Sequence, residues 1–325
     1  MISAMNSSIS TTYCIGDIPV EILTTILFQL ADENLHDLLV ISRTCRLWRS
    51  IIVNNLFLNK RFNIFKKKYL LGHWTFEDTD KLGHDSCDYT KDQFSLIGNP
   101  IQSHCFLGSC LHLDGNSVIT VPVNEFSRYQ TDCFAVSCWF LVTGWSPLHN
   151  TMPFQTVIGA WEHPDQHWLH LGFSETTRFI QNQVMISAEH IQFDCNSTTP
   201  IELNTWYHVV TQVSRKKQEI YVNGHLQKTV LMTSKASATE IWTSGRTYPN
   251  APWSKQEMQR PETLCIGAKC LRPFPHNFWL GELADLCIWT RWLEPIEIMA
   301  IYESKAKLDN INIGQLIVDK MAKLR

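Results

Sequence analysis

The hydrophobic period of this chain changes near residue 70, and this change limits the kinds of domain that the chain can form. Between residues 16 and 62, apolar side chains recur every three or four positions, as Ile22, Ile26 and Leu30 do, which is typical of short amphipathic helices. From Leu70 onward, short β-prone runs alternate with turn-forming residues, which is typical of strands. The sequence therefore predicts a small helical module in front of a larger β domain.

Three short helices are predicted within the front module. Pro19 suits the first position of a helix, because its missing N–H is no loss there, and Glu21 complements the positive end of the helix dipole. A second helix is expected to begin near Leu35 or His36, and a third to contain Trp48. About 45 residues bury too little surface to be stable alone. The module is therefore predicted to need a partner surface.

The motifs of this module resemble an F-box in their order and spacing. They are Ile18-Pro19, Ile26-Leu27, Leu30, Asp37-Leu38, Cys45-Arg46-Leu47-Trp48 and Ile51. Ile18 replaces the leucine of the family pattern and keeps its volume and polarity. The resemblance implies docking onto the Skp-type adaptor of a cullin-RING ubiquitin ligase. The residues that it implies for this contact, or for supporting it, are Ile18, Pro19, Ile22, Leu23, Leu27, Leu38, Leu39, Val40 and Trp48. The alternative is a helical cap that packs only on its own downstream domain.

The composition is that of a globular chain. Its 325 residues allow one large or two ordinary domains. Hydrophobic residues make up 44% and charged residues 18% of the chain, without the long polar runs of a disordered protein. A net charge of −3 provides no general attraction to nucleic acid or anionic lipid. Neither a nucleic-acid partner nor a membrane partner is predicted.

An intracellular protein of the cytoplasm or nucleus is expected. The first residues lack a basic start followed by an apolar run, so no secretory signal is predicted. The longest apolar stretch, Val20 to Leu30, is too short to cross a bilayer. The cysteines number eleven, and this odd count without a signal peptide predicts free thiols. The usual zinc spacing, Cys-x-x-Cys, is absent.

The larger domain is predicted to be an all-β sandwich or jelly roll. Residues 134–142, 206–213 and 219–222 form β-prone runs, and the first of them is fairly apolar on both faces, as an inner strand of a packed sheet pair is. Asn223-Gly224 follows the third run directly and predicts a tight hairpin, because both residues tolerate positive φ. Gly115-Asn116 is expected to join two further strands in the same manner. Many short strands with frequent turns indicate packed antiparallel sheets.

A second resemblance is carried by these strands. Residues 204–210 (Asn-Thr-Trp-Tyr-His-Val-Val) and 220–224 (Ile-Tyr-Val-Asn-Gly), together with Trp279 to Asp285 near the end, resemble the laminin-G and concanavalin A-like jelly-roll superfamily. The predicted organisation is an F-box-like module at 14–62, a short linker at 63–69, the sandwich at 70–303 and a helical C-terminal tail at 304–325. The fold class is therefore mainly β: a jelly-roll sandwich preceded by three helices.

The chain is predicted to bind a target, and neither a catalytic residue nor a required cofactor is predicted. Some relatives of the fold bind calcium through acidic groups, and here Ala284 occupies the expected place with Asp285 one residue on and Asp85 in the early loop. Calcium needs six to eight oxygen ligands, so metal binding stays a minor alternative. Glycosidases need paired carboxylates about 5 Å apart, and no strand offers such a pair.

Two aromatic, turn-rich segments are the predicted target-binding surface. Long loops within compact domains are often functional, and Trp, Tyr and Arg dominate the energetics of interfaces. The candidates are Trp145, Trp161, Trp242, Arg246, Tyr248 and Trp253. The alternative is that these rings close the open ends of the sandwich.

The two resemblances together predict a substrate-recognition subunit of a Skp–cullin–F-box ubiquitin ligase. The front helices are expected to dock the adaptor, and through it a cullin, while the sandwich holds a protein or glycoprotein target. Such a subunit would contribute to catalysis only by holding the target close to another protein that carries out the chemistry. The main alternative is a glycan-binding, lectin-like protein without a ligase role. A hydrolase is the third and least supported interpretation.

Overall fold

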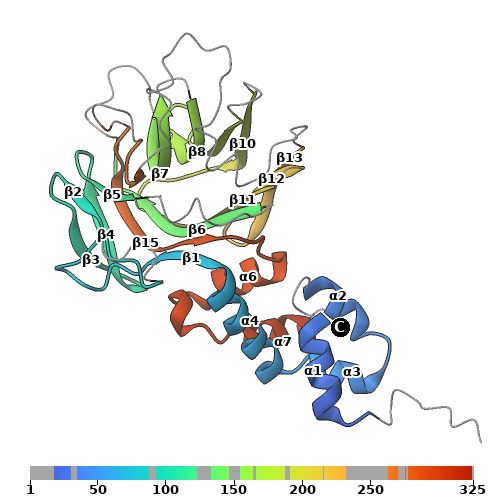
Figure 1. The fold of residues 1–325 in the computed structure, drawn as a ribbon. Coiled ribbons are helices and arrows are strands. Elements are labelled where there is room, and N and C mark those ends of the chain that lie inside the picture. Colours follow the sequence, from blue (N-terminus) through green and yellow to red (C-terminus); the bar gives the residue numbers. More distant parts are fainter. Residues whose placement is uncertain are drawn as a thin grey trace, which may run out of the picture.

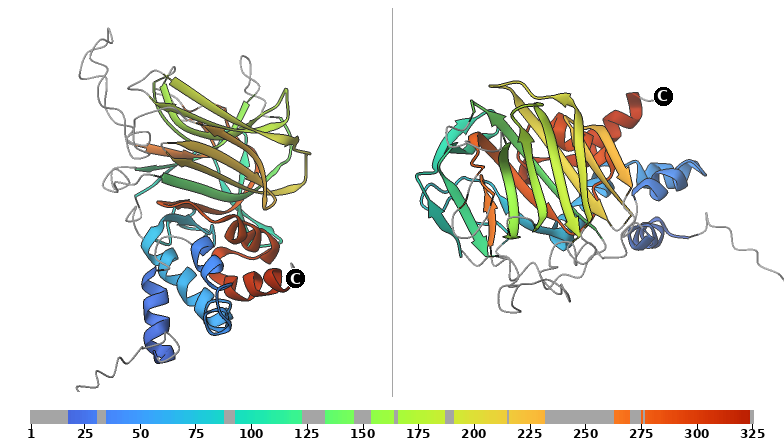
Figure 2. Two further views of the ribbon diagram at one scale, coloured as in Figure 1. Left: turned by 90° about the vertical axis from the view of Figure 1, so that its right-hand side faces the viewer. Right: turned by 90° about the horizontal axis from the view of Figure 1, so that it is seen from above.

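The computed structural model is a two-sheet sandwich with helices packed against one of its faces (Figures 1 and 2). It describes residues 18–30, 35–87, 93–122, 133–145, 154–163, 166–186, 191–214, 216–231, 263–269, 275 and 277–323. The predicted fold class, a mainly β sandwich preceded by a small helical module, is confirmed.

The N-terminal helices are α1 (Val20–Leu30), α2 (Leu35–Ile41), α3 (Arg46–Ile52) and α4 (Asn55–Tyr69). The first helix begins directly after Pro19, as its fixed φ favours. The side chain of Asn54 caps the fourth helix by accepting hydrogen bonds from two backbone N–H groups of its first turn. Pro19 and the Asn54 cap therefore explain where α1 and α4 start.

The fourth helix runs through the segment that the sequence assigned to a linker. Residues 63–69 form its C-terminal half, and the chain passes from Tyr69 directly into the first strand. Leu58, Phe62 and Phe65 are buried along one side of the helix, which is the spacing of an amphipathic stripe. The junction between the two parts of the molecule is therefore helical.

Within the described residues, sheet A has eight strands in the order β13-β12-β11-β6-β15-β4-β3, with β1 paired to β15. Its strands are β1 (Leu70–Trp74), β3 (Ile101–Cys105), β4 (Gly108–Asp114), β6 (Cys133–Val142), β11 (Trp206–Ser214), β12 (Lys217–Val222), β13 (His225–Leu231) and β15 (Leu280–Trp289). All pairings are antiparallel. The apolar runs predicted at 134–142, 206–213 and 219–222 lie in this sheet.

Sheet B has seven strands in the part of the chain that the structure describes, in the order β10-β9-β8-β7-β14-β5-β2. Its strands are β2 (Ser95–Ile97), β5 (Val118–Pro122), β7 (Phe154–His163), β8 (Gln166–Ser174), β9 (Phe179–Ile186), β10 (Ile191–Pro200) and β14 (Thr263–Ile266). The main core fills the space between the sheets, where Val136 and Leu171 are buried on facing strands. This arrangement is that of a face-to-face β-sandwich.

One of the two predicted turns of Asn and Gly is a hairpin and the other is not. Asn223 and Gly224 have φ of 51° and 79° and join the paired strands β12 and β13, as the sequence predicts. The turn at Gly115, with φ of 82°, instead leads from β4 in sheet A to β5 in sheet B. The hairpin prediction was wrong there, because a local turn signal does not determine which sheet the next strand joins.

The C-terminal residues form α6 (Pro295–Ser304), the short 3-10 helix η4 (Leu308–Asn310) and α7 (Ile313–Lys323). A second hydrophobic core joins these helices, the N-terminal helices and the outer face of sheet A; it includes Phe62, Trp289 and Ile317. The helical module therefore shares its core with the rest of the chain and does not bury its apolar surface alone.

The cysteines differ in one respect from the prediction of free thiols. Eight of those in the described part of the chain are free, whereas Cys265 is disulfide-bonded. Burial of Cys110, Cys138, Cys195 and Cys287 agrees with their expected role as small hydrophobic residues. Among the described helices, none is both long and apolar enough to cross a membrane.

Candidate docking site on the N-terminal helices

The first helix presents apolar side chains to solvent as well as to the core. Leu23 and Leu27 are buried, while Val20, Ile22 and Ile26 are 48%, 52% and 39% exposed. A surface helix of a globular protein normally carries one apolar stripe and a polar opposite face. A helix with apolar residues on further sides is suited to packing against a second surface, so α1 is the first part of the candidate site.

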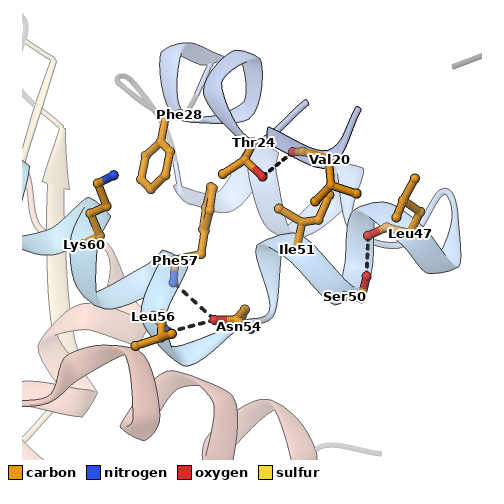
Figure 3. A pocket seen from close by; sticks show the side chains of 10 residues that line it. All are labelled: Val20, Thr24, Phe28, Leu47, Ser50, Ile51, Asn54, Leu56, Phe57 and Lys60. Atoms are coloured by element: carbon orange, nitrogen blue, oxygen red, sulfur yellow. Dashed lines mark hydrogen bonds between the residues drawn. The ribbon is translucent and has the colours of Figure 1, made fainter. Parts of the chain in front are cut away.

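A pocket of about 440 Å³ lies between α1, α3 and α4 (Figure 3). Its lining residues are Val20, Thr24, Phe28, Leu47, Ser50, Ile51, Asn54, Leu56, Phe57 and Lys60. The Phe28 and Phe57 rings stack with centroids 4.3 Å apart. The Lys60 ammonium lies 5.1 Å from the centroid of the Phe28 ring, a cation–π distance. The pocket therefore combines an aromatic wall with one positive charge at its rim.

Hydroxyl groups in this pocket are already satisfied by their own helices. Thr24 donates from Oγ1 to the carbonyl of Val20 at 2.6 Å, and Ser50 donates from Oγ to the carbonyl of Leu47 at 2.7 Å (Figure 3). Each hydroxyl proton is thus committed within the helix. A partner entering this pocket meets mainly apolar surface, so burial of an apolar side chain is the interaction that the pocket favours.

A second pocket of about 520 Å³ follows the exposed side of α4. It shares Leu56 and Lys60 with the first pocket and is also lined by Ile64 and Lys67. Leu56 is 78% exposed and Ile64 is 45% exposed. The two pockets form one surface that combines apolar side chains with the ammonium groups of Lys60 and Lys67. This surface suits a partner with apolar side chains and nearby carboxylates.

The structure divides the nine residues predicted for adaptor docking into three groups. Those buried in the shared core are Leu23, Leu27 and Leu38. Those exposed to solvent are Pro19, Ile22 and Val40. Those half-buried against the core are Ile18, Leu39 and Trp48. The buried group supports the helices from inside, whereas the exposed group is available to a partner.

The sequence interpretation does not include most of the residues that line the pocket. Val20, Thr24 and Phe28 recur at intervals of four on α1, which is itself a helical signal. They do not belong to the stripe that contains Leu23 and Leu27, so the motif spacing does not point to them. Leu56 lies beyond the motif that carries the F-box resemblance, and its exposure depends on how α4 crosses the other helices.

Only one of the predicted target-binding side chains lies among the described ones. Trp145 is 40% exposed, its ring centroid lies 5.9 Å from that of Phe173, and the Arg178 guanidinium lies 5.9 Å from its ring. The side chain of Trp161 and the residues Trp242, Arg246, Tyr248 and Trp253 fall outside the described part. Trp145 with Arg178 is thus an exposed aromatic–cation pair at an end of the sandwich.

The acidic residues considered for calcium lie on both sides of one histidine. Asp285 Oδ1 is 2.7 Å from Nε2 of His73, and Asp85 Oδ1 accepts from the backbone N–H of His73 at 2.7 Å. The other Asp285 oxygen accepts from the backbone N–H of Leu308 at 3.0 Å. The thiol of Cys287 completes a buried trio with His73 and Asp285 whose ligand atoms lie within 4.8 Å of one another. In the described structure these groups tie β1, β15 and the C-terminal segment together.

Two family profiles match the chain. The concanavalin A-like lectin/glucanases superfamily matches residues 113–299, which is more than half of the chain, and the F-box-like domain matches residues 15–64. The chain therefore belongs to the concanavalin A-like lectin/glucanases superfamily and carries an F-box-like domain at its N-terminal side. Both predicted resemblances are confirmed. No curated protein sequence matches the chain.

Solved structures of similar fold include the following bacterial proteins. Botulinum neurotoxin type C, whose cell entry depends on interaction with two ganglioside molecules, has a TM-score of 0.52 and 13% identity, over 75% of this chain and 53% of that one. The binding domain of Paraclostridial Mosquitocidal Protein 1 has a TM-score of 0.52 and 14% identity, over 73% and 52%. Domain 4 of a Geobacillus stearothermophilus arabinanase has a TM-score of 0.46 and 15% identity, over 71% and 96%. This chain thus spans about half the length of the first two of these structures, and their likeness shows the fold alone.

Proposed function

We propose that this protein is an intracellular substrate receptor of a Skp–cullin–F-box ubiquitin ligase. The observation that carries the proposal is the exposed apolar surface of α1 and α2 on a module that matches an F-box-like domain. Docking of the Skp-type adaptor buries this surface, and burial of each large apolar side chain contributes about 1.5–3 kcal/mol before the costs of association. The adaptor in turn connects the chain to a cullin.

In this proposal the sandwich holds a target and supplies no catalytic group. The ligase reaction needs the target lysine to be kept near the charged conjugating enzyme, and proximity alone can provide a large part of a rate enhancement. The helical junction formed by α4, together with the core it shares with sheet A, supports this role because it gives the sandwich a defined position relative to the docking helices.

Binding of a purified Skp-type adaptor to the full chain tests the proposal. We expect Ile22→Glu and Val40→Glu each to weaken binding at least about tenfold, because a carboxylate is then buried in an apolar contact. Both positions are exposed, so the folded chain should keep its thermal unfolding midpoint. Leu231→Glu is the matched control, since Leu231 is 76% exposed on β13 of the sandwich. Equal binding by all three variants and the parent would overturn the proposal.

Glycans are a second candidate class of ligand for the sandwich. Trp145 offers an exposed ring beside Arg178, and rings of this kind stack against the apolar faces of sugars while a nearby cation binds acidic groups. The type C neurotoxin of similar fold interacts with gangliosides, which are acidic glycolipids. A glycan array with the parent and Trp145→Ala decides this candidate, which fails if no glycan is retained or if the variant retains the same set.

A further inference from the structure

Two cysteines lie side by side on the β3–β4 hairpin, at the edge of sheet A where the described strand order ends (Figure 1). In the hairpin register Ser103 faces Cys110 and Cys105 faces Gly108, so Cys105 and Cys110 are diagonal neighbours on one face. Cys110 is buried and Cys105 is half-buried. The pair therefore combines one partly exposed cysteine with one buried cysteine.

The thiol of Cys110 lies between two acceptors. It hydrogen-bonds to the sulfur of Cys105, and its Sγ lies 3.5 Å from Oε2 of Glu282 on β15. The other Glu282 oxygen accepts from the hydroxyl of Ser103 at 3.3 Å, which holds the carboxylate in place. A proton on Cys110 therefore has one path toward Cys105 and another toward Glu282.

The surroundings make Cys105 the more acidic of the two thiols. The hydrogen bond from Cys110 and one from the backbone N–H of Leu107 lower the pKa of Cys105 to about 7, against the opposing effect of burial. The pKa of Cys110 is raised, by its bond to Cys105 and by burial. Burial also raises the pKa of Cys138 and Cys287. The thiolate is the reactive form, so reactivity concentrates at Cys105.

We propose that Cys105 and Cys110 form a hydroperoxide-sensitive modification site, in which Cys105 is oxidised first and Cys110 then closes an intramolecular disulfide. A reactive, accessible cysteine beside a second thiol is the arrangement found in redox-sensing sites. The site lies on the sandwich, away from the docking helices, and the proposal does not depend on the ligase role.

The reaction balances in two steps. The Cys105 thiolate attacks one oxygen of hydrogen peroxide, the O–O bond breaks, and the products are the sulfenic acid of Cys105 and hydroxide, which takes a proton to become water. Cys110 then passes its proton to Glu282 as its sulfur attacks that of Cys105. The S–S bond forms, the S–O bond breaks, and the departing hydroxide recovers the proton as a second water. Both sulfurs are oxidised and the peroxide is reduced.

Closing the bond requires a small movement of the hairpin. Diagonal partners across antiparallel strands stand slightly farther apart than a disulfide allows. β3 is a short strand that pairs with β4 at the end of the described order, so it can shift with little loss of sheet structure. The turn between the two strands contains Phe106, which is 47% exposed and packs edge-on against Trp139 with centroids 5.0 Å apart. Oxidation is therefore expected to reposition an exposed aromatic ring.

Mass spectrometry of the full chain after treatment with hydrogen peroxide at pH 7 tests the proposal. In the parent we expect a peptide containing both cysteines to lose two hydrogen atoms and to regain them with dithiothreitol. Cys110→Ser should stop at the sulfenic acid of Cys105, trapped as a dimedone adduct. Cys105→Ser should leave Cys110 reduced. Cys45, a free and exposed thiol of the helical module, is the internal reference, and we expect Cys105 to react about fivefold faster.

A second variant tests whether Glu282 accepts the proton of Cys110, without changing the shape of the side chain. Glu282→Gln keeps the shape of the side chain and removes the proton acceptor, so we expect disulfide closure to slow while the sulfenic acid of Cys105 still forms at the parent rate. The proposal is overturned if Cys105 reacts no faster than Cys45, or if Cys110→Ser gives the same products as the parent.

Discussion

The guanidinium of Arg61 in α4 and the carboxylate of Glu297 in α6 meet at 3.3 Å in a buried ion pair between segments 236 residues apart in the chain. Arg291 completes the cluster with a two-pronged contact to the same carboxylate, at 2.9 Å and 3.0 Å. Burial would raise the pKa of Glu297, but the two guanidiniums hold it below its usual range. The cluster therefore links α4 to α6 and to the segment that follows β15.

We predict that Glu297→Gln destabilises the protein far more than Arg61→Met does. Removing the carboxylate leaves the buried Arg61 and the partly buried Arg291 facing each other without a counter-charge, and breaking a buried pair in this way costs about 3–5 kcal/mol. Removing Arg61 leaves the Arg291–Glu297 pair intact and should cost about 1–2 kcal/mol, mainly through lost packing. Urea unfolding of the two variants gives both values. Equal losses would contradict the assignment of Glu297 as the centre of the cluster.

The close approach of α7 to α4 leads to a second prediction. A Cβ added at Gly314 would lie 2.2 Å from the carbonyl oxygen of Asn55 and 2.7 Å from the backbone nitrogen of Asn59, so Gly314→Ala must push the helices apart. We expect a loss of about 1–3 kcal/mol, although alanine favours a helix over glycine. The measurement is the thermal midpoint.

Ala322→Ser is the matched control for this exchange, because it also adds one heavy atom to α7 but at an exposed position. It should change stability by no more than about 0.5 kcal/mol. A stable Gly314→Ala variant would mean that α7 is not held tightly against α4.

Much of the fold was predictable because its signals are local. The first three helices follow from the spacing around Ile22 and Trp48, and the β12–β13 hairpin follows from Asn223-Gly224. The fourth helix was not predictable in the same way. Its basic end, which contains Lys66, resembles a solvated linker, and in the structure this lysine pairs with Asp309 at 2.8 Å. Asp309 is 243 residues away in the chain, so the local sequence around Lys66 does not predict this ion pair.

The candidate site was predictable in its position but less so in its parts. The motif spacing predicts that α1 is a docking element and names Ile22 and Val40, which are exposed. The motif spacing does not show that Leu27 is buried in the core, because the burial of Leu27 depends on how α1 packs against the other helices. For the same reason the pocket beside Phe28 and Phe57 (Figure 3) emerges only from the tertiary arrangement.

A buried amide pair between the sheets provides a third prediction. Asn182 on β9 donates from Nδ2 to Oε1 of Gln218 on β12 at 3.1 Å, and both residues are fully buried. The remaining oxygen of Asn182 and nitrogen of Gln218 have no partner among the described residues. We expect Asn182→Leu alone to cost about 1–3 kcal/mol, because the Gln218 amide is then left unpaired.

The double variant Asn182→Leu/Gln218→Met should recover most of that loss, since no buried amide remains. Urea unfolding of the two single variants and the double variant completes the cycle. Additive losses in the double variant would show that the two amides do not act as a pair.

Acid sensitivity is the fourth prediction, and it centres on His208. This imidazole is buried against Trp139, with ring centroids 5.0 Å apart, and burial, reinforced by the nearby charge of Lys305, lowers the pKa of His208 to about 3. The unfolded chain binds a proton at this position below pH 6.5 and the folded chain does not, so stability falls as the pH drops from 6.5 toward 3. By pH 5 the loss from this residue is about 2 kcal/mol.

His208→Phe retains a ring and removes the titrating group, so its free energy of unfolding should decline less between about pH 7 and pH 5 than that of the parent. The control is His225→Phe at an exposed site, which should keep the parent's decline; an identical decline in all three proteins would assign the acid sensitivity to other groups.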